Sequence, residues 1–94
     1  MDIRQALGAA LKSARRRRGL TQEDFGSVSS RTYLSTLERG LKSPTLDKIQ
    51  EISEVLGVHP LTLLSMAYMQ RDSKSASELL DAIAKELGPR MPGN

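Results

Sequence analysis

The sequence predicts an all-α fold, and three observations favour it. Apolar residues recur at helical spacing along most of the chain, residues that cap helices precede these segments, and no stretch alternates as a strand does. The 94 residues suffice for one domain with one modest core. The expected helices cover residues 2–18, 22–27, 31–39, 46–56, about 60–70 and 76–87.

The first expected helix has one apolar stripe and a basic end. Four consecutive arginines, residues 15–18, lie where cations favour the negative end of the helix dipole. Gly19 follows, at the left-handed position that commonly ends a helix. The stripe that should face the core consists of Ile3, Leu7, Ala10, Leu11 and Ala14.

Capping residues define the next two helices, which are short. Thr21 is a good N-cap for the second helix and Ser30 for the third, with a turn between them. Gly40 ends the third helix, in which Leu34 and Leu37 define the inward direction.

The fourth and fifth helices complete the expected core. Thr45 caps the fourth helix and Gly57 ends it. His59 caps the fifth helix, and Pro60 occupies its first turn, where a missing N–H costs little. The residues of the fourth helix expected to face inward are Leu46, Ile49, Ile52, Val55 and Leu56.

The chain should therefore divide at a polar break. Residues 1–70 form the main domain, and residues 71–75 form a polar linker without an apolar member. Residues 76–87 form an amphipathic helix that opens with a capping-box pair, Ser75 and Glu78. Residues 88–94 are expected to be a disordered tail.

Composition and charge limit the possible functions. The net charge is +3, with +5 on residues 1–42 and −2 on the remaining residues. The basic first half can therefore attract a polyanion, although simple solubility explains the charge equally well. There is no cysteine, which suits a reducing cytosol and excludes disulfides and thiolate chemistry. No apolar run could span a membrane and no secretion signal is evident, so we expect a cytoplasmic protein.

Two short helices joined by a tight turn, in a small bundle with a basic first half, indicate a helix-turn-helix. The sequence blocks that strengthen this prediction are LTQEDF at 20–25, RTYLSTLERG at 31–40, SPTL at 43–46 and LGVHPL at 56–61. In combination they resemble the Cro/phage-repressor (XRE) family over roughly residues 3–66. The resemblance implies a lambda-repressor-like five-helix DNA-binding domain, followed here by a C-terminal helix.

The turn is the one departure from the family pattern. The segment between the two motif helices is two residues shorter than is usual in the family, so the second helix must be shorter or the turn tighter. Gly26 matches the position where the family has a small residue that lets the two helices approach closely.

The third helix is the expected recognition helix. Recognition helices present their N-terminal residues to base edges in the major groove, where arginine binds guanine and threonine can meet a thymine methyl group. An ordinary solvated polar face is the alternative. The residues expected to contact bases are Arg31, Thr32, Ser35 and Thr36.

Contacts to phosphates should fix the position of this helix. Gln22 resembles the family glutamine that reaches a phosphate, whereas a solvated loop lysine explains Lys42 equally well. The phosphate candidates are Thr21, Gln22, Ser30, Arg39, Lys42 and Ser43. Tyr33 could lie against a phosphate or pack on the first helix.

The resemblance also implies a structural ion pair. In this family an arginine late in the first helix pairs with the glutamate of the Glu-Arg-Gly block, and Arg15 and Glu38 match these positions. The pair would hold the third helix against the first.

The last helix has an apolar stripe that must dock somewhere, because a lone helix of about 12 residues is marginal in water. Repressors of this type bind palindromes as dimers, so we expect a dimer interface made by Leu79, Leu80, Ile83 and Leu87; packing within one chain is the alternative.

The predicted function is that of a dimeric repressor bound to a palindromic operator in double-stranded DNA. A controller protein of a restriction-modification system is one alternative, and an antitoxin whose last helix covers a toxin is another. An enzyme is poorly supported, since the chain has no cysteine, one histidine and no glycine-rich phosphate loop. We expect no cofactor and no metal, because His59 alone cannot form a zinc site.

Overall fold

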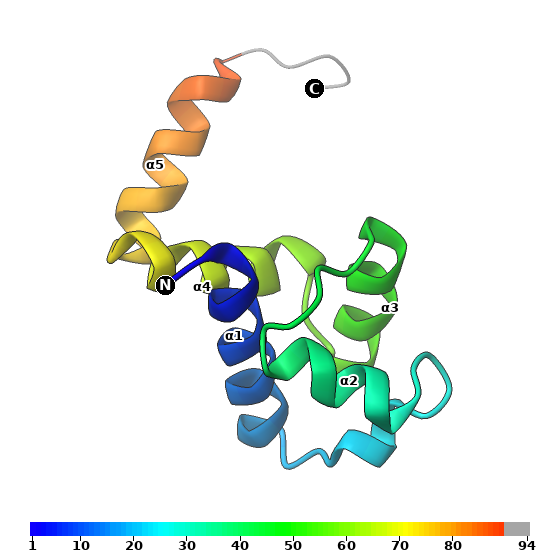
Figure 1. The fold of residues 1–94 in the computed structure, drawn as a ribbon. Coiled ribbons are helices and arrows are strands. Elements are labelled where there is room, and N and C mark those ends of the chain that lie inside the picture. The colour runs from blue at the N-terminus through cyan, green and yellow to red at the C-terminus, as the bar shows by residue number, and fades with distance from the viewer. Residues whose placement is uncertain (90–94) are drawn as a thin grey trace.

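The computed structural model describes residues 1–89, and all regular elements in that range are helical (Figure 1). The all-α prediction is therefore confirmed, while the predicted tail at residues 90–94 lies outside the described range. The elements are α1 (Ile3–Arg17), η1 (Gln22–Phe25, a 3-10 turn), α2 (Arg31–Glu38), α3 (Leu46–Leu56), α4 (Pro60–Asp72) and α5 (Ala76–Leu87).

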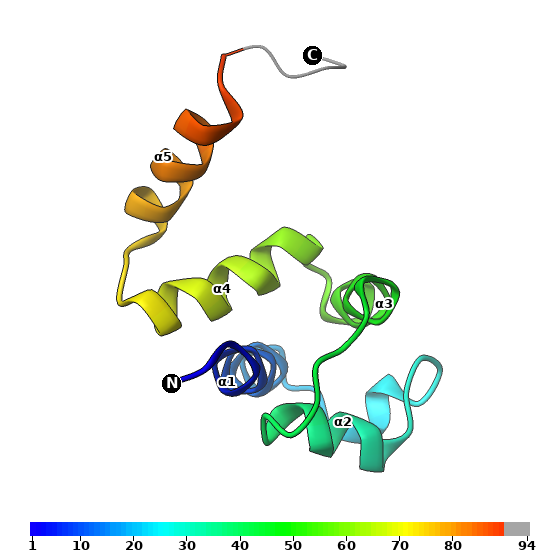
Figure 2. The same cartoon turned by 45° about the horizontal axis from the view of Figure 1, so that its top comes forward.

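Helix α1 is the centre of the bundle. In Figure 2, which looks nearly along α1, α4 lies on one side of it and α2 on the other. Asp2 starts the helix by accepting the N–H of Gln5 at 2.8 Å, and the Gln5 amide oxygen accepts the N–H of Asp2 in return. The buried face of α1 carries mostly small side chains, which let its neighbours approach: Ala6, Ala10, Leu11 and Ala14.

A glycine in the middle of α1 sets the distance to α2. A Cβ atom on Gly8 would lie 2.5 Å from the carbonyl oxygen of Leu37 and 2.6 Å from that of Glu38. The close-approach role expected for Gly26 is wrong, since a Cβ there would meet only the Glu23 carbonyl of its own turn. Because η1 ends at Phe25, Gly26 already belongs to the turn and does not lie between packed helices.

The core lies where α1, η1, α2, α3 and α4 meet. Leu34 and Leu37 point inward as predicted. Leu46 was predicted to face inward, and this is wrong, because its side chain is 81% exposed. It is the first residue of α3, and the core begins one turn later at Ile49. The largest fully buried apolar side chains are Phe25, Leu11, Leu34, Ile52, Leu56 and Leu63.

The shortened motif turn, residues 26–30, is held from α3. The second helix is one 3-10 turn that ends at Phe25 and does not reach Ser27 as expected. Lys48 of α3 donates a hydrogen bond to the Val28 carbonyl and pairs with Glu51 at 3.0 Å. The lysine therefore connects the turn that precedes α2 to the body of the bundle.

The polar linker is shorter than predicted. Helix α4 continues through residues 71 and 72, so the expected linker of residues 71–75 is reduced to residues 73–75. Both residues can extend the helix because their polar side chains remain in solvent. Ser73 then adopts a left-handed conformation with φ of 52°, and its N–H bonds to the Met69 carbonyl.

Candidate nucleic-acid interface

Helix α2 presents a polar face away from the core. The Ser30 hydroxyl caps the helix by accepting the N–H of Tyr33 at 3.1 Å. Three base-contact candidates lie on the side opposite Leu34 and Leu37: Thr32, which is exposed, and Ser35 and Thr36, which are half-buried. Arg31 is exposed at the N-terminal end of the helix.

The two threonines of this face are linked. The Thr36 hydroxyl donates to the carbonyl of Thr32 at 2.8 Å. This bond uses the hydroxyl proton, so Thr36 offers outward an acceptor and a methyl group. A methyl group and an acceptor suit contact with a thymine methyl or a base donor.

Arg31 is held toward η1 by a partner that sequence reasoning missed. Its Nη1 atom lies 3.2 Å from Oε1 of Glu23, and the two side chains are 70% and 73% exposed. Such an exposed pair contributes little to folding stability. An acidic residue in the helix expected just before the recognition helix was the only sequence signal available for it.

Two of the phosphate candidates have donors that are engaged inside the protein. The N–H and hydroxyl of Thr21 both donate to Asp24, at 2.7 and 3.1 Å. The side-chain amide of Gln22 donates to Glu38 at 3.2 Å. Phosphate contact by these side chains would require an exchange of hydrogen bonds, and it stays a prediction.

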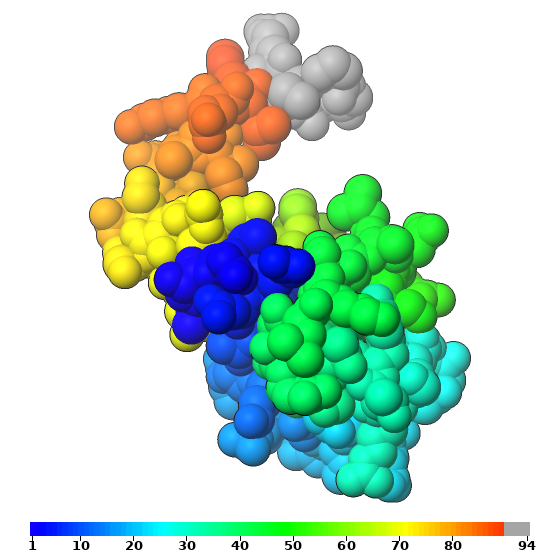
Figure 3. Space-filling model, viewed as in Figure 1, coloured from blue at the N-terminus to red at the C-terminus, as the bar shows by residue number. Residues whose placement is uncertain are grey.

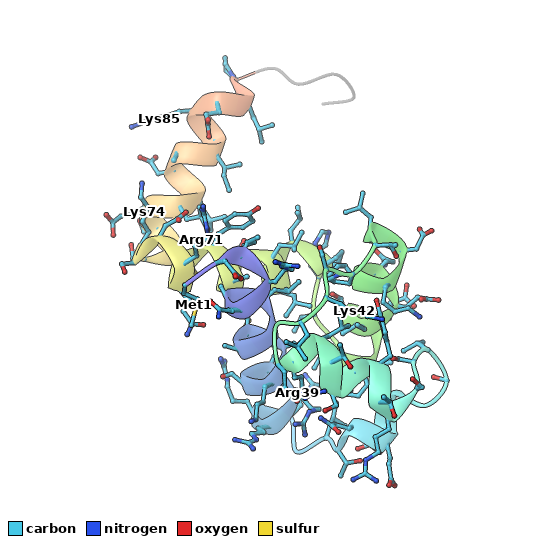
Figure 4. All side chains as sticks on the ribbon, in the orientation of Figure 1. Met1, Arg39, Lys42, Arg71, Lys74 and Lys85 are labelled. Carbon is cyan, nitrogen blue, oxygen red and sulfur yellow. The ribbon has the colours of Figure 1, made fainter. Side chains whose placement is uncertain are left out.

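The remaining phosphate candidates are open to solvent. Arg39 is the C-cap of α2 and is exposed, as are Ser30, Lys42 and Ser43. The ammonium group of Lys42 lies 5.9 Å from the centre of the Tyr33 ring. This distance is that of a cation–π contact on one face of the ring. Figure 4 shows Arg39 and Lys42 beside α2, far from Arg71 of α4, Lys74 of the linker and Lys85 of α5.

Arg15 and Glu38 form the expected ion pair, and both side chains are largely buried. The Nε and Nη2 atoms of Arg15 lie 2.6 and 3.0 Å from the two carboxylate oxygens, and the side chains are only 11% and 4% exposed. Arg15 also donates to the Leu20 carbonyl at 3.0 Å. Hydrogen bonding to Glu38 raises the pKa of Arg15, although burial opposes it. With Gln22 on the same carboxylate, this network joins α1, η1 and α2.

Helix α5 stands apart from the rest of the molecule and contacts mainly the end of α4 (Figure 3). None of its residues 76–87 is buried. Leu80, Ile83 and Leu87 are 55%, 38% and 51% exposed, and Leu79 is half-buried. An apolar groove between α4 and α5 continues this surface, with Leu61, Met66, Met69, Ala76 and Leu80 among its lining residues.

Residues 1–89 contain neither a candidate metal-binding cluster nor a candidate membrane span. This part of the chain holds no cluster of three or more His, Asp or Glu residues that could bind a metal ion. It also contains no helix long and apolar enough to cross a membrane.

The geometry defines a class of protein. A short capped helix with a polar outward face, held by a tight turn against a second short helix in an all-α bundle, is a helix-turn-helix DNA-binding domain. The chain matches the helix-turn-helix family over residues 11–63. It belongs to the XRE-type helix-turn-helix family of DNA-binding transcriptional regulators, which is not an enzyme family.

Two relatives and two solved structures agree with this assignment. The chain is 40% identical over 67 residues to the uncharacterized HTH-type transcriptional regulator y4dJ of Sinorhizobium fredii, covering 69% of this chain and 87% of y4dJ. It is 38% identical over 66 residues to the control protein C.BamHI of Bacillus amyloliquefaciens, covering 67% and 82%. Two crystal structures of the clp gene regulator ClgR from Corynebacterium glutamicum superpose with TM-scores of 0.69 and 0.73. Their identities to this chain are 33% and 30%; the first match covers 74% of this chain and 94% of ClgR, the second 96% and 98%.

Proposed function

We propose that this protein acts in the cytoplasm as a dimeric repressor that places α2 of each protomer in the major groove of a palindromic operator. The observation that carries the proposal is the polar outward face of α2, made by Thr32, Ser35 and Thr36, with the exposed Arg31 at its N-terminal end. In this arrangement Arg31 and the threonines read bases, since their donors, acceptors and methyl groups match base edges. Two half-sites about one helical turn apart would suit a two-fold dimer.

Phosphate contacts would set the position of α2. The exposed candidates near the ends of α2 can reach the DNA backbone: Ser30, Arg39, Lys42 and Ser43. Thr21 and Gln22 could do so after an exchange of hydrogen bonds. These contacts add affinity for every sequence, whereas the face of α2 adds preference.

Dimerisation would use the apolar stripe of α5. Leu79, Leu80, Ile83 and Leu87 lie on one face of a helix with no buried residue, and burying such side chains fully is worth about 1.5–3 kcal/mol each. The groove between α4 and α5 extends the same surface. A second copy that covers the stripe would supply the partner that an isolated amphipathic helix needs.

Sedimentation of the full-length protein and of three variants tests this interface. Leu80→Glu and Ile83→Glu should give monomers, because they place like charges across a two-fold seam. Lys85→Gln lowers the net charge by the same one unit on the opposite side of α5 and should leave the dimer intact. If the two stripe variants stay dimeric, the interface lies elsewhere; a monomeric wild-type protein would instead favour a partner protein, such as a toxin, on α5.

Control of a restriction-modification system is the second candidate, and the similarity to the control protein C.BamHI favours it. Nuclease footprinting on the DNA around its own gene would separate the roles. A free-standing regulator should protect its own promoter without any partner, and a controller should protect a promoter shared with restriction-modification genes.

A further inference from the structure

A carboxylate lies on the surface that should face DNA. Glu23 belongs to η1 and contacts Arg31, the first residue of α2, at 3.2 Å. Both side chains are exposed, so the pair adds little to stability. A negative charge near phosphates weakens binding to DNA of every sequence. Glu23 therefore cannot contribute to affinity for DNA, and a role other than affinity has to explain a carboxylate on this surface.

The surroundings leave Arg31 as the partner of Glu23. A shallow depression between η1 and α2 is lined by these two residues together with Arg15, Leu20, Thr21 and Gln22. The polar side chains among the other four are engaged: Arg15 and Gln22 bind Glu38, and Thr21 binds Asp24. The contact between Glu23 and Arg31 therefore has no competitor in this depression.

The contact uses only one side of the guanidinium group. Glu23 accepts a hydrogen bond from Nη1 of Arg31. Arginine has five donors in a rigid planar fork, so the donors on its other edge remain available. Guanine offers O6 and N7 side by side to two such donors in the major groove.

We propose that Glu23 is a specificity-determining residue that holds Arg31 in the orientation that reads guanine and keeps it from acting as a general phosphate contact. This inference rests on the proposed function. Held at one edge, Arg31 presents the other edge to a base. A swing toward a phosphate breaks the contact with Glu23 and brings the carboxylate nearer to negative charge.

Replacing Glu23 should therefore change selectivity and affinity in opposite directions. Glu23→Gln should lower the preference at the base pair read by Arg31 by up to about fivefold, the most that an exposed ion pair can impose on the orientation of Arg31. The same variant should bind unrelated duplexes several-fold more tightly, because each protomer loses one negative charge. Glu54→Gln is the matched control: it removes the same charge from the exposed face of α3, so it should leave the preference unchanged.

Selection from a pool of random-sequence duplexes tests the inference with full-length wild type, Glu23→Gln, Arg31→Ala, the Glu23→Gln/Arg31→Ala double variant and Glu54→Gln. We expect Glu23→Gln to lose preference at the same position as Arg31→Ala while the rest of the motif persists. The double variant should then match Arg31→Ala at that position.

Two results would overturn the role of Glu23 while leaving the proposed function intact. In one, Glu23→Gln selects the wild-type motif although Arg31→Ala does not. In the other, Glu23→Gln loses a different position, which means that Glu23 itself accepts a hydrogen bond from a cytosine. A wild-type protein that selects no motif would contradict the proposed function, and this inference with it.

Discussion

Removing the Glu38 carboxylate should destabilise the fold severely. Glu38 accepts hydrogen bonds from Nε and Nη2 of Arg15 and from the Gln22 amide, and its side chain is only 4% exposed. In Glu38→Ala the guanidinium of Arg15, 11% exposed, retains only its bond to the Leu20 carbonyl. Breaking one side of a buried pair costs about 3–5 kcal/mol, because the other charge stays buried without its partner.

That cost is large for a domain of this size. Small domains hold on the order of 5–15 kcal/mol, and each kcal/mol shifts Tm by roughly 4–8 °C. We therefore expect Glu38→Ala to lower Tm by more than about 12 °C. Thermal unfolding followed by circular dichroism at 222 nm, where α-helices give a strong signal, would measure this. If Glu38→Ala does not fold, Glu38→Gln, which keeps a hydrogen-bonding side chain, should show a smaller loss in the same assay.

A double change and a matched control distinguish charge burial from simple loss of contacts. Arg15→Leu combined with Glu38→Leu should recover much of the loss, because a packed apolar pair avoids the desolvation cost. Glu23→Ala also breaks an Arg–Glu pair, but an exposed one, and should cost about 0–1 kcal/mol. The reasoning is refuted if Glu38→Ala is no more destabilising than Glu23→Ala.

Three further predictions concern packing and capping. Gly8→Ala should lower Tm, because its Cβ would lie 2.5 Å from a carbonyl oxygen of α2 and force the helices apart, at a cost of about 1–3 kcal/mol; the exposed Ser13→Ala serves as control. Ser53→Ala should raise the midpoint of urea unfolding, because the buried Ser53 hydroxyl has no hydrogen-bond partner among residues 1–89. The gain in the free energy of unfolding should be up to about 1 kcal/mol, and a lower midpoint would contradict this. Hydrogen bonds from the backbone and hydroxyl of Ser75 lower the pKa of Glu78, so the Glu78 half of the capping box should stabilise α5 fully above the ordinary glutamate pKa. This contribution should be lost as pH falls through the lowered value. Amide exchange at the start of α5 should report this loss, and Glu78→Gln should abolish the pH dependence.

Local signals in the sequence were sufficient to locate most helix ends. Gly19 and Gly57 adopt φ of 69° and 74°, a left-handed conformation that glycine reaches without strain. The His59 ring accepts the N–H of Leu61 at 3.0 Å, and Ser75 forms its capping box. Each of these features involves residues within a few positions of one another, so neighbouring residue types are enough to predict them.

Features that depend on distant segments could not be predicted in the same way. Periodicity assigned Leu46 to the inward face of its helix, but it cannot tell whether another element covers that end. A glycine inside a helix is a costly choice, so Gly8 gave a hint of close packing, although not of its partner. The contacts of Lys48 with Val28 and of Glu23 with Arg31 join residues 20 and 8 positions apart, and only the folded bundle brings them together.

The candidate nucleic-acid interface shows the same difference between local and distant sequence signals. The positions of Leu34 and Leu37 predicted which side of α2 faces inward, and the match to the family motif predicted the pairing of Arg15 with Glu38. The engagement of Gln22 with Glu38 was not evident, since it depends on how the shortened η1 lies against α1 and α2.

The most direct test of the central claim, that a dimer anchored on phosphates reads DNA through α2, is the affinity of the full-length protein for duplex DNA as a function of salt. Fluorescence anisotropy would compare a duplex carrying the selected motif with a scrambled duplex of equal length. If each protomer neutralises about 3–4 phosphates, log affinity should fall against log salt with a slope of roughly −5 to −7, and the motif should bind at least about a thousandfold more tightly. A slope near zero, with equal affinity for both duplexes, would contradict the account.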